Sequence, residues 1–161
     1  MTTNESILGP LMRSQAMLQQ MVSPFTAEQW LHRPVSGANC PAWIVGHLCV
    51  VERIGCCVAA GREPPLPDPD FEKRYARDDY APKAARYEDV EKLLPTFDQY
   101  RGVIVDAVAR MPLEKFSQPL KDPHPLFKNV GEMMAFLPMH TMLHLGQLST
   151  IRRSLGYPPL F

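Results

Sequence analysis

The segment that decides the fold is residues 130–155, VGEMMAFLPMHTMLHLGQLSTIRRSL. Apolar residues recur in it at steps of three and four, which is the period of an amphipathic α-helix. We therefore expect one long helix that ends before Gly156 and is kinked, or starts afresh, at Pro138. The face that should point to the core comprises Met133, Phe136, Leu137, His140, Leu143, His144, Leu148 and Ile151.

Three more long helices are predicted from the same period. The first covers about residues 6–22 and carries Pro10 in its first turns, where proline is best tolerated. The second begins at Asn39 or Cys40, with Pro41 in the first helical position, and ends at Gly61. The third covers about residues 87–111, and Pro95 should bend it. The expected apolar positions are Ile7, Leu11, Leu18 and Met21 in the first helix, Trp43, His47, Val50, Val51, Ile54 and Val58 in the second, and Val90, Leu94, Phe97, Val103, Val105 and Val108 in the third.

No segment shows the alternation of a β-strand, so the predicted fold class is all-α: a single four-helix bundle over residues 1–161. A short helical turn should follow Thr26, because Gln29 completes a capping box. The long connection between the second and third helices, residues 62–86, is rich in proline and charge. It is either a solvated crossover or a flap over a site.

The composition of the chain argues against several classes of function. The chain has 17 Lys and Arg against 17 Asp and Glu, so its formal net charge is zero and no basic surface for nucleic acid is expected. The N-terminal residues do not resemble a signal peptide. The most apolar window, residues 42–60, is interrupted by His47, Glu52 and Arg53, so we expect no membrane span and a cytoplasmic protein.

The four cysteines, Cys40, Cys49, Cys56 and Cys57, lie within 18 residues. Without a secretion signal a disulfide framework is not expected, and we interpret them as reduced thiols. Zinc binding by these cysteines is an alternative, although no CxxC spacing occurs.

Three histidines form the candidate functional site. His140 and His144 are four residues apart, which puts both imidazoles on one face of a helix. The spacing is that of the zinc motif HExxH, with Thr141 in place of the glutamate. His47 lies on the apolar face of its own helix, and buried imidazoles are costly without partners. We therefore predict that the three converge on one divalent metal ion, at about 2.0–2.2 Å if it is zinc. The alternative is three separate core histidines, each bonded to a carbonyl or polar side chain.

Other polar residues carry weaker signals. Gln147 follows His144 by three residues and either orients a metal ligand or is an ordinary residue at the rim. His32 and His124 fall in predicted loops and should be solvated. Paired carboxylates, a Ser-His-Asp order and a glycine-rich phosphate loop are not evident. The methionines expected to fill the core are Met133, Met134, Met139 and Met142.

Four motifs carry a family resemblance. They are Trp43-Ile-Val-Gly-His47-Leu48, His140-xxx-His144-Leu-Gly-Gln147-Leu, Arg152-Arg153-xx-Gly156-x-Pro158, and Thr26-Ala-Glu-Gln-Trp followed by Arg33-Pro34. Together they resemble the DinB/YfiT-like superfamily of metalloenzymes, over nearly the whole chain.

The resemblance implies a four-helix bundle of unusual connectivity, frequent homodimers, and a zinc or nickel ion on His47, His140 and His144. Characterised relatives include S-transferases and isomerases that use low-molecular-weight thiols such as mycothiol or bacillithiol. This chain departs from many members at Thr141, where they carry a carboxylate, and at Leu145, where they carry arginine.

Three neutral histidines leave a tetrahedral ion one open position, as in catalytic sites. Such an ion lowers the pKa of bound water or binds a thiol as thiolate. The sequence is thus compatible with a thiol transferase acting on a small electrophile or with a hydrolase, and no general base decides between them. A metal-binding or stress-response bundle without turnover, and a purely structural bundle, remain alternatives.

Overall fold

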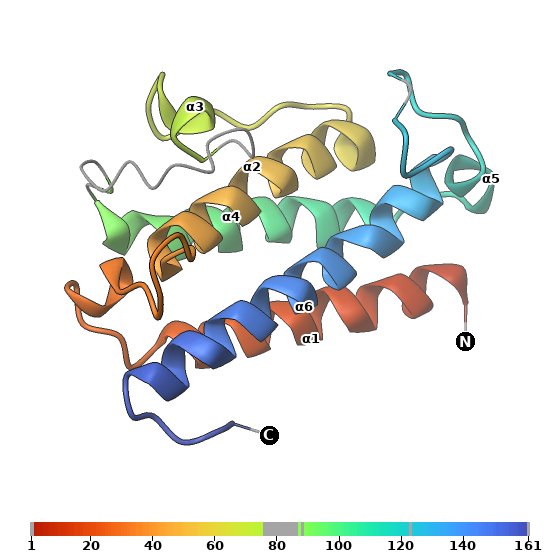
Figure 1. The fold of residues 1–161 in the computed structure, drawn as a ribbon. Helices are drawn as coiled ribbons and strands as arrows, with labels where there is room; N and C mark the ends of the chain where they lie inside the picture. Colours follow the sequence, from red (N-terminus) through yellow and green to blue (C-terminus); the bar gives the residue numbers. More distant parts are fainter. Residues whose placement is uncertain (1, 76–86, 88, 123, 161) are drawn as a thin grey trace.

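The computed structural model describes residues 2–75, 87, 89–122 and 124–160, and these residues form helices joined by loops (Figure 1). The long helices are α1 (Thr3–Val22), α2 (Pro41–Ala60), α4 (Val90–Ala109) and α6 (Val130–Ser154). Three short elements lie between them: η1 (Gln29–Leu31), α3 (Phe71–Tyr75) and α5 (Leu113–Phe116). In the described ranges the only extended pairing is an isolated bridge between Pro119 and Asn129. The predicted all-α class is confirmed.

The four long helices pack in a ring whose order differs from their order in the chain. Helix α2 packs against α4 and α6, and α1 packs against the same two helices. Consecutive helices α1 and α2 therefore lie diagonally across the bundle, and so do α4 and α6. In Figure 1 the first long helix and the last lie side by side, at opposite ends of the colour scale. This diagonal arrangement is the unusual connectivity that the resemblance implies.

Local sequence explains where the helices begin and end. Thr2 and Glu5 form a reciprocal capping box, which starts α1 three residues earlier than predicted. The predicted box between Thr26 and Gln29 is confirmed by its two hydrogen bonds. Gly61 ends α2 with a positive φ of 68°, which glycine adopts without strain. Helix α6 is continuous through Pro138, so of the two alternatives predicted there, a kink or a fresh start, the fresh start does not occur.

The predicted core faces of α2 and α6 are partly wrong. Ile54 is 50% exposed and Leu143 68% exposed, while the core side of α2 is formed by residues such as Ile44, Leu48 and Cys56. Helix α2 is apolar around most of its circumference, so its period alone does not select the buried face. On α6, Met133 and Met134 are buried as expected, whereas Met139 and Met142 are exposed.

Among the described helices, α2 alone is long and apolar enough to cross a membrane. The expectation that its polar and charged residues interrupt the apolar window too strongly for a span is therefore wrong as far as length and composition go. Within the bundle, however, α2 packs against α3 and η1 as well as against α4 and α6. A buried core helix has the same length and composition as a membrane span. Its apolar character is therefore accounted for by its central place in the bundle.

The long connection after α2 is described as far as Tyr75, and its remaining part, residues 76–86, lies outside the described residues. Its described part is not simply solvated. Phe71 and Tyr75 of α3 are buried, and α3 packs against α2. The connection therefore covers one side of the helix that carries His47.

Candidate metal centre

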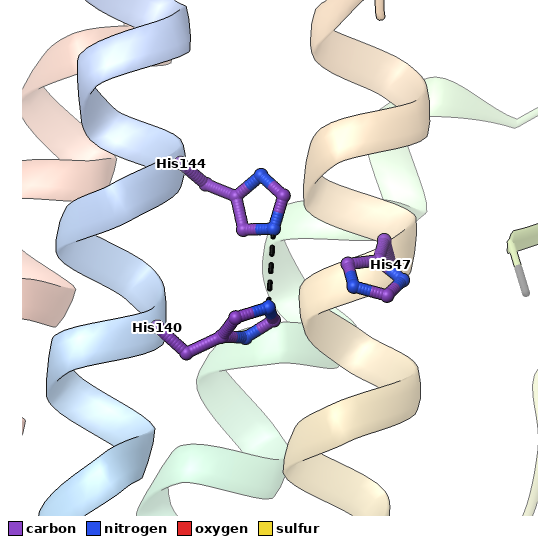
Figure 2. A group of neighbouring side chains, drawn as sticks. All are labelled: His47, His140 and His144. Atoms are coloured by element: carbon purple, nitrogen blue, oxygen red, sulfur yellow. Dashed lines mark hydrogen bonds between the residues drawn. The ribbon is translucent and has the colours of Figure 1, made fainter. Parts of the chain in front are cut away.

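The three predicted histidines come together between α2 and α6 (Figure 2). His47 extends from α2, and His140 and His144 extend from successive turns of α6. One ligand atom of each lies within 4.8 Å of the ligand atoms of the other two. The Nε2 atoms of His140 and His144 are 3.2 Å apart. The predicted convergence is thus observed, and the group has the geometry to hold a metal ion.

The spacing of the nitrogens fits a tetrahedral ion. Zinc–nitrogen bonds of about 2.0 Å place neighbouring ligands of a tetrahedron ~3.3 Å apart. The 3.2 Å between His140 and His144 already matches that edge. The widest separation, at most 4.8 Å, closes to the same value through a side-chain movement of about 1.5 Å.

Hydrogen bonds on the far side of two rings set their tautomers. The Nδ1 atom of His47 lies 3.0 Å from the carbonyl oxygen of Tyr75, which accepts only, so Nδ1 carries the proton. The Nδ1 atom of His144 lies 3.2 Å from Oε1 of Gln147 in the same way. In both residues the lone pair is left on Nε2, as in metal sites whose ligands are oriented by a partner behind the ring. The orienting role of Gln147, one of its two predicted readings, is supported.

Burial keeps the side chain of His144 neutral. His47 and His144 are only 9% and 8% exposed. Burial, and after it the electrostatic effect of the nearby His47, lower the pKa of His144 to about 4, while the bond to Gln147 acts in the opposite direction. The indole of Trp43 stacks on His47 at 4.8 Å with the rings 5° from parallel. At neutral pH His144 is therefore an uncharged imidazole, the form that binds a cation.

Gly46 allows the connection to approach His47 closely. A Cβ at this position would lie 2.3 Å from the ring atoms Cδ1 and Cε1 of Tyr75, much closer than two carbons can approach. Only glycine leaves room for that ring against α2. The same residue, Tyr75, supplies the carbonyl that accepts from His47. The glycine before the histidine in the sequence motif is thus part of the site.

A cavity of about 1120 Å³ opens over the histidines. Asn39, Trp43 and Gln147 line it near the three rings, and the rest of its wall runs along α2 and α6 under the loop that precedes α6. Its volume slightly exceeds the range of about 300–1,000 Å³ that is typical of small-molecule sites. The histidines therefore face a space that a substrate can enter.

A buried ion pair that was not predicted from the sequence lies directly beside the site. Arg101 of α4 is fully buried and donates from Nε and Nη2 to the two carboxylate oxygens of Glu52 at 2.7 Å. It also donates to the hydroxyl of Thr141, the residue after His140. The sequence signal was present: Glu52 and Arg101 are charged residues within apolar helical patterns. Thr141, which departs from the carboxylate of many relatives, is an acceptor for this arginine.

The remaining candidates lie outside the histidine group. All four cysteines are free, as predicted, and burial raises the pKa of Cys56 to about 12. In the part of the chain that the structure describes, the three histidines are the only group with the arrangement to hold a metal, so cysteine ligation finds no support. His32 is half-buried and bonds to Ser154, whereas His124 is exposed as expected.

The fold and the site together define a class: a four-helix bundle of diagonal connectivity with three histidines converging from two helices. The DinB superfamily model matches residues 11–148. This chain therefore belongs to the DinB superfamily, as the motifs around His47 and His144 indicated. No sequence among the curated proteins matches it.

Proposed function

We propose that this chain is a metal-dependent enzyme that binds zinc or nickel through His47, His140 and His144 and activates a low-molecular-weight thiol toward a small electrophile. The observation that supports metal binding best is the orientation of the rings. Tyr75 and Gln147 hold the Nδ1 protons of His47 and His144, so both Nε2 lone pairs are available at the site. Neutral imidazoles suit zinc and nickel alike.

A thiol is favoured over water as the activated group. A bound divalent ion supplies Lewis acidity that stabilises the deprotonated form of a thiol or water. The cavity wall nearest the histidines carries amide, indole and apolar side chains, and among its described residues the one carboxylate is Asp122 in the loop before α6. With no base beside the rings, the more acidic group has the advantage. A free thiol has a pKa near 8.5, far below the value of about 15.7 for bulk water.

The protein's own side chains would position the reactants. Trp43 and Phe136 flank the histidines with aromatic surface, which excludes water from one side of the thiolate. Asn39 donates to Oε1 of Gln147 at 3.5 Å, so the amide that orients His144 is itself held. The protein's own thiols are unsuited as nucleophiles, because burial raises the pKa of Cys40, Cys49 and Cys57.

The test combines elemental analysis with a substrate screen. The purified protein should contain close to one equivalent of zinc or nickel, and a panel of electrophiles should be consumed only when a low-molecular-weight thiol is added. His140→Ala should lose both properties. His32→Ala, which changes a histidine outside the site, should keep both.

The alternatives predict different results in the same assay. Ester hydrolysis without thiol, lost in His140→Ala, would identify a hydrolase. Metal binding with no turnover of any electrophile would identify a metal-binding or stress-response protein and contradict the enzyme proposal.

We also propose that the protein is a cytoplasmic homodimer that binds neither membrane nor nucleic acid. The support for a dimer is the exposed apolar pair Met139 and Met142 on α6, together with the family resemblance. Light scattering should give twice the mass of the chain. The monomeric mass at high concentration would contradict the dimer.

A further inference from the structure

One apolar face of α2 faces the cavity rather than the core. Trp43, His47, Val51, Ile54 and Val58 follow one another at steps of three and four, and all five line the cavity. Ile54 is 50% exposed, whereas the next residue, Gly55, is buried on the core side of α2. A row of branched apolar side chains beside a candidate reaction centre suits an apolar ligand better than it suits water.

The opposite wall has the same character. Val130, Met133 and Phe136 of α6 line the cavity on the N-terminal side of His140. Helices α2 and α6 pack together, so these residues face the apolar row on α2 across the cavity. Between the histidines and the end of α2, both helices therefore present apolar surface.

The length of this channel follows from helix geometry. Eleven residues separate His47 from Val58, which corresponds to ~16 Å along α2. Beyond Val58 the channel reaches Lys115, whose ammonium donates to the carbonyl of Ala59 at 2.9 Å. The channel thus has polar groups at its two ends and apolar surface along both helices, while the loop side also carries Gln118, Lys121 and Asp122.

An aromatic row lines the channel on the loop side. Phe136 stacks on His140 at 5.3 Å and contacts Phe127 at 4.7 Å, and His124 stacks on Phe127 at 4.1 Å. This row joins the loop before α6 to one of the three histidines. A ligand in the channel would therefore contact aromatic side chains on the loop side as well as the two helices.

We propose that the substrate or cosubstrate of this site is an amphiphile: its reacting polar group lies at the three histidines and its apolar chain extends along α2 toward Val58. This inference rests on the proposed function for the reacting end only. The apolar channel itself requires no metal. A small polar thiol would leave the row of Val51, Ile54 and Val58 against water, whereas a chain of this length would cover it.

The experiment compares unbranched thiols of increasing length on the zinc-loaded protein. Calorimetry with ethanethiol, butanethiol, hexanethiol and octanethiol should show that each added methylene tightens binding about fourfold, the value expected for burial of one CH₂. Ile54→Glu should flatten this dependence on length while ethanethiol binds as before. Met12→Glu, an exposed apolar residue of α1 away from the cavity, should leave the dependence unchanged.

A second series separates this inference from the metal proposal. Unbranched alcohols of the same lengths, titrated into metal-free protein, should show the same rise in affinity and the same loss in Ile54→Glu. If thiols of all lengths bind equally, the channel proposal is wrong while the metal site stands. If the protein binds no metal but the alcohols show the rise, the channel stands and the proposed function fails. Equal affinity across both series overturns the inference.

Discussion

Two neighbouring polar clusters lie inside the bundle, and they differ in how completely their hydrogen-bonding groups are paired. In the first, the five N–H donors of Arg101 all have acceptors: Glu52 takes two hydrogen bonds, and Leu11, Ser14 and Thr141 take one each. In the second, two histidines point Nε2 atoms at each other across 3.2 Å. The Nδ1 atom of His144 is bonded away from the centre, to Oε1 of Gln147.

The difference separates a structural cluster from a functional one. The arginine cluster ties all four long helices together and has no capacity for a further ligand. The histidine cluster directs lone pairs into a space where at most one proton can be shared between His140 and His144. A cation at that point satisfies all of them. Through Arg101 the first cluster links Glu52 of α2 to Thr141 of α6. It thereby holds together the two helices that carry the three histidines.

The largest expected effect on stability comes from breaking the arginine cluster. Arg101→Met leaves the Glu52 carboxylate buried without its partner, and such a change costs about 3–5 kcal/mol of unfolding free energy. Urea denaturation measures this loss. The double variant Glu52→Leu with Arg101→Met should recover much of it, because replacing a whole buried pair by apolar residues is often neutral. If the single variant is as stable as the wild type, the cluster does not hold the bundle together.

The contrast between the clusters also explains what the sequence could reveal. The histidines were found because their spacing has a chemical meaning within one helix, and His47 because an imidazole on an apolar face is costly. Arg101 and Glu52 are 49 residues apart. Nothing local indicates that these charges meet, since their pairing depends on α2 lying beside α4.

A second effect should appear when pH is lowered in the absence of metal. His144 takes up its proton near pH 4 in the folded protein and near its ordinary value of 6.5 when unfolded. Between these values the unfolded chain binds more protons, so the unfolding free energy falls with decreasing pH, by about 3 kcal/mol at pH 4. Above pH 6.5 the residue is neutral in both states and contributes no pH dependence.

The comparison that isolates this residue is His144→Gln, unfolded by urea in the presence of a chelator at pH 7 and near pH 4. The variant lacks the imidazole, so its loss of stability over this interval should be smaller than that of the wild type by the same amount. Equal losses in the two proteins would show that His144 is not held neutral by burial.

Gly46→Ala should have a smaller effect on stability, and it should disturb the histidine cluster through Tyr75. The added Cβ would meet the Tyr75 ring at 2.3 Å, so the ring must move, at a cost of about 1–3 kcal/mol for overpacking. Metal affinity should fall as well, since the Tyr75 carbonyl moves away from His47. Gly102→Ala in α4, where a Cβ meets nothing within 4 Å, should instead stabilise the protein by up to about 1 kcal/mol. Thermal melting and a chelator titration distinguish the two variants.

Tyr75, which the connection after α2 contributes to the site, could not be predicted from the sequence either. The sequence left open whether residues 62–86 form a solvated crossover or a flap, because a proline-rich segment has no period from which to infer contacts. What places Tyr75 is the absence of a side chain at Gly46, on another element. The motif contained that glycine, but its reason is visible only when the two segments are side by side.

The smallest expected effect concerns the amide behind His144. Gln147→Leu removes the acceptor of the Nδ1 proton at 3.2 Å, so the ring loses its orientation and its preferred tautomer. Loss of such a partner typically weakens metal binding about 10-fold or more, and a competition titration against a chromophoric chelator measures it. Stability without metal should hardly change, because Gln147 is exposed. Gln99→Leu, an exposed glutamine of α4 away from the site, is the matched control and should keep the wild-type affinity. Equal affinities in the two variants would mean that Gln147 is an ordinary residue at the rim. Of the two hydrogen bonds proposed to orient the histidine cluster, only that of His47 to Tyr75 would then matter for metal binding.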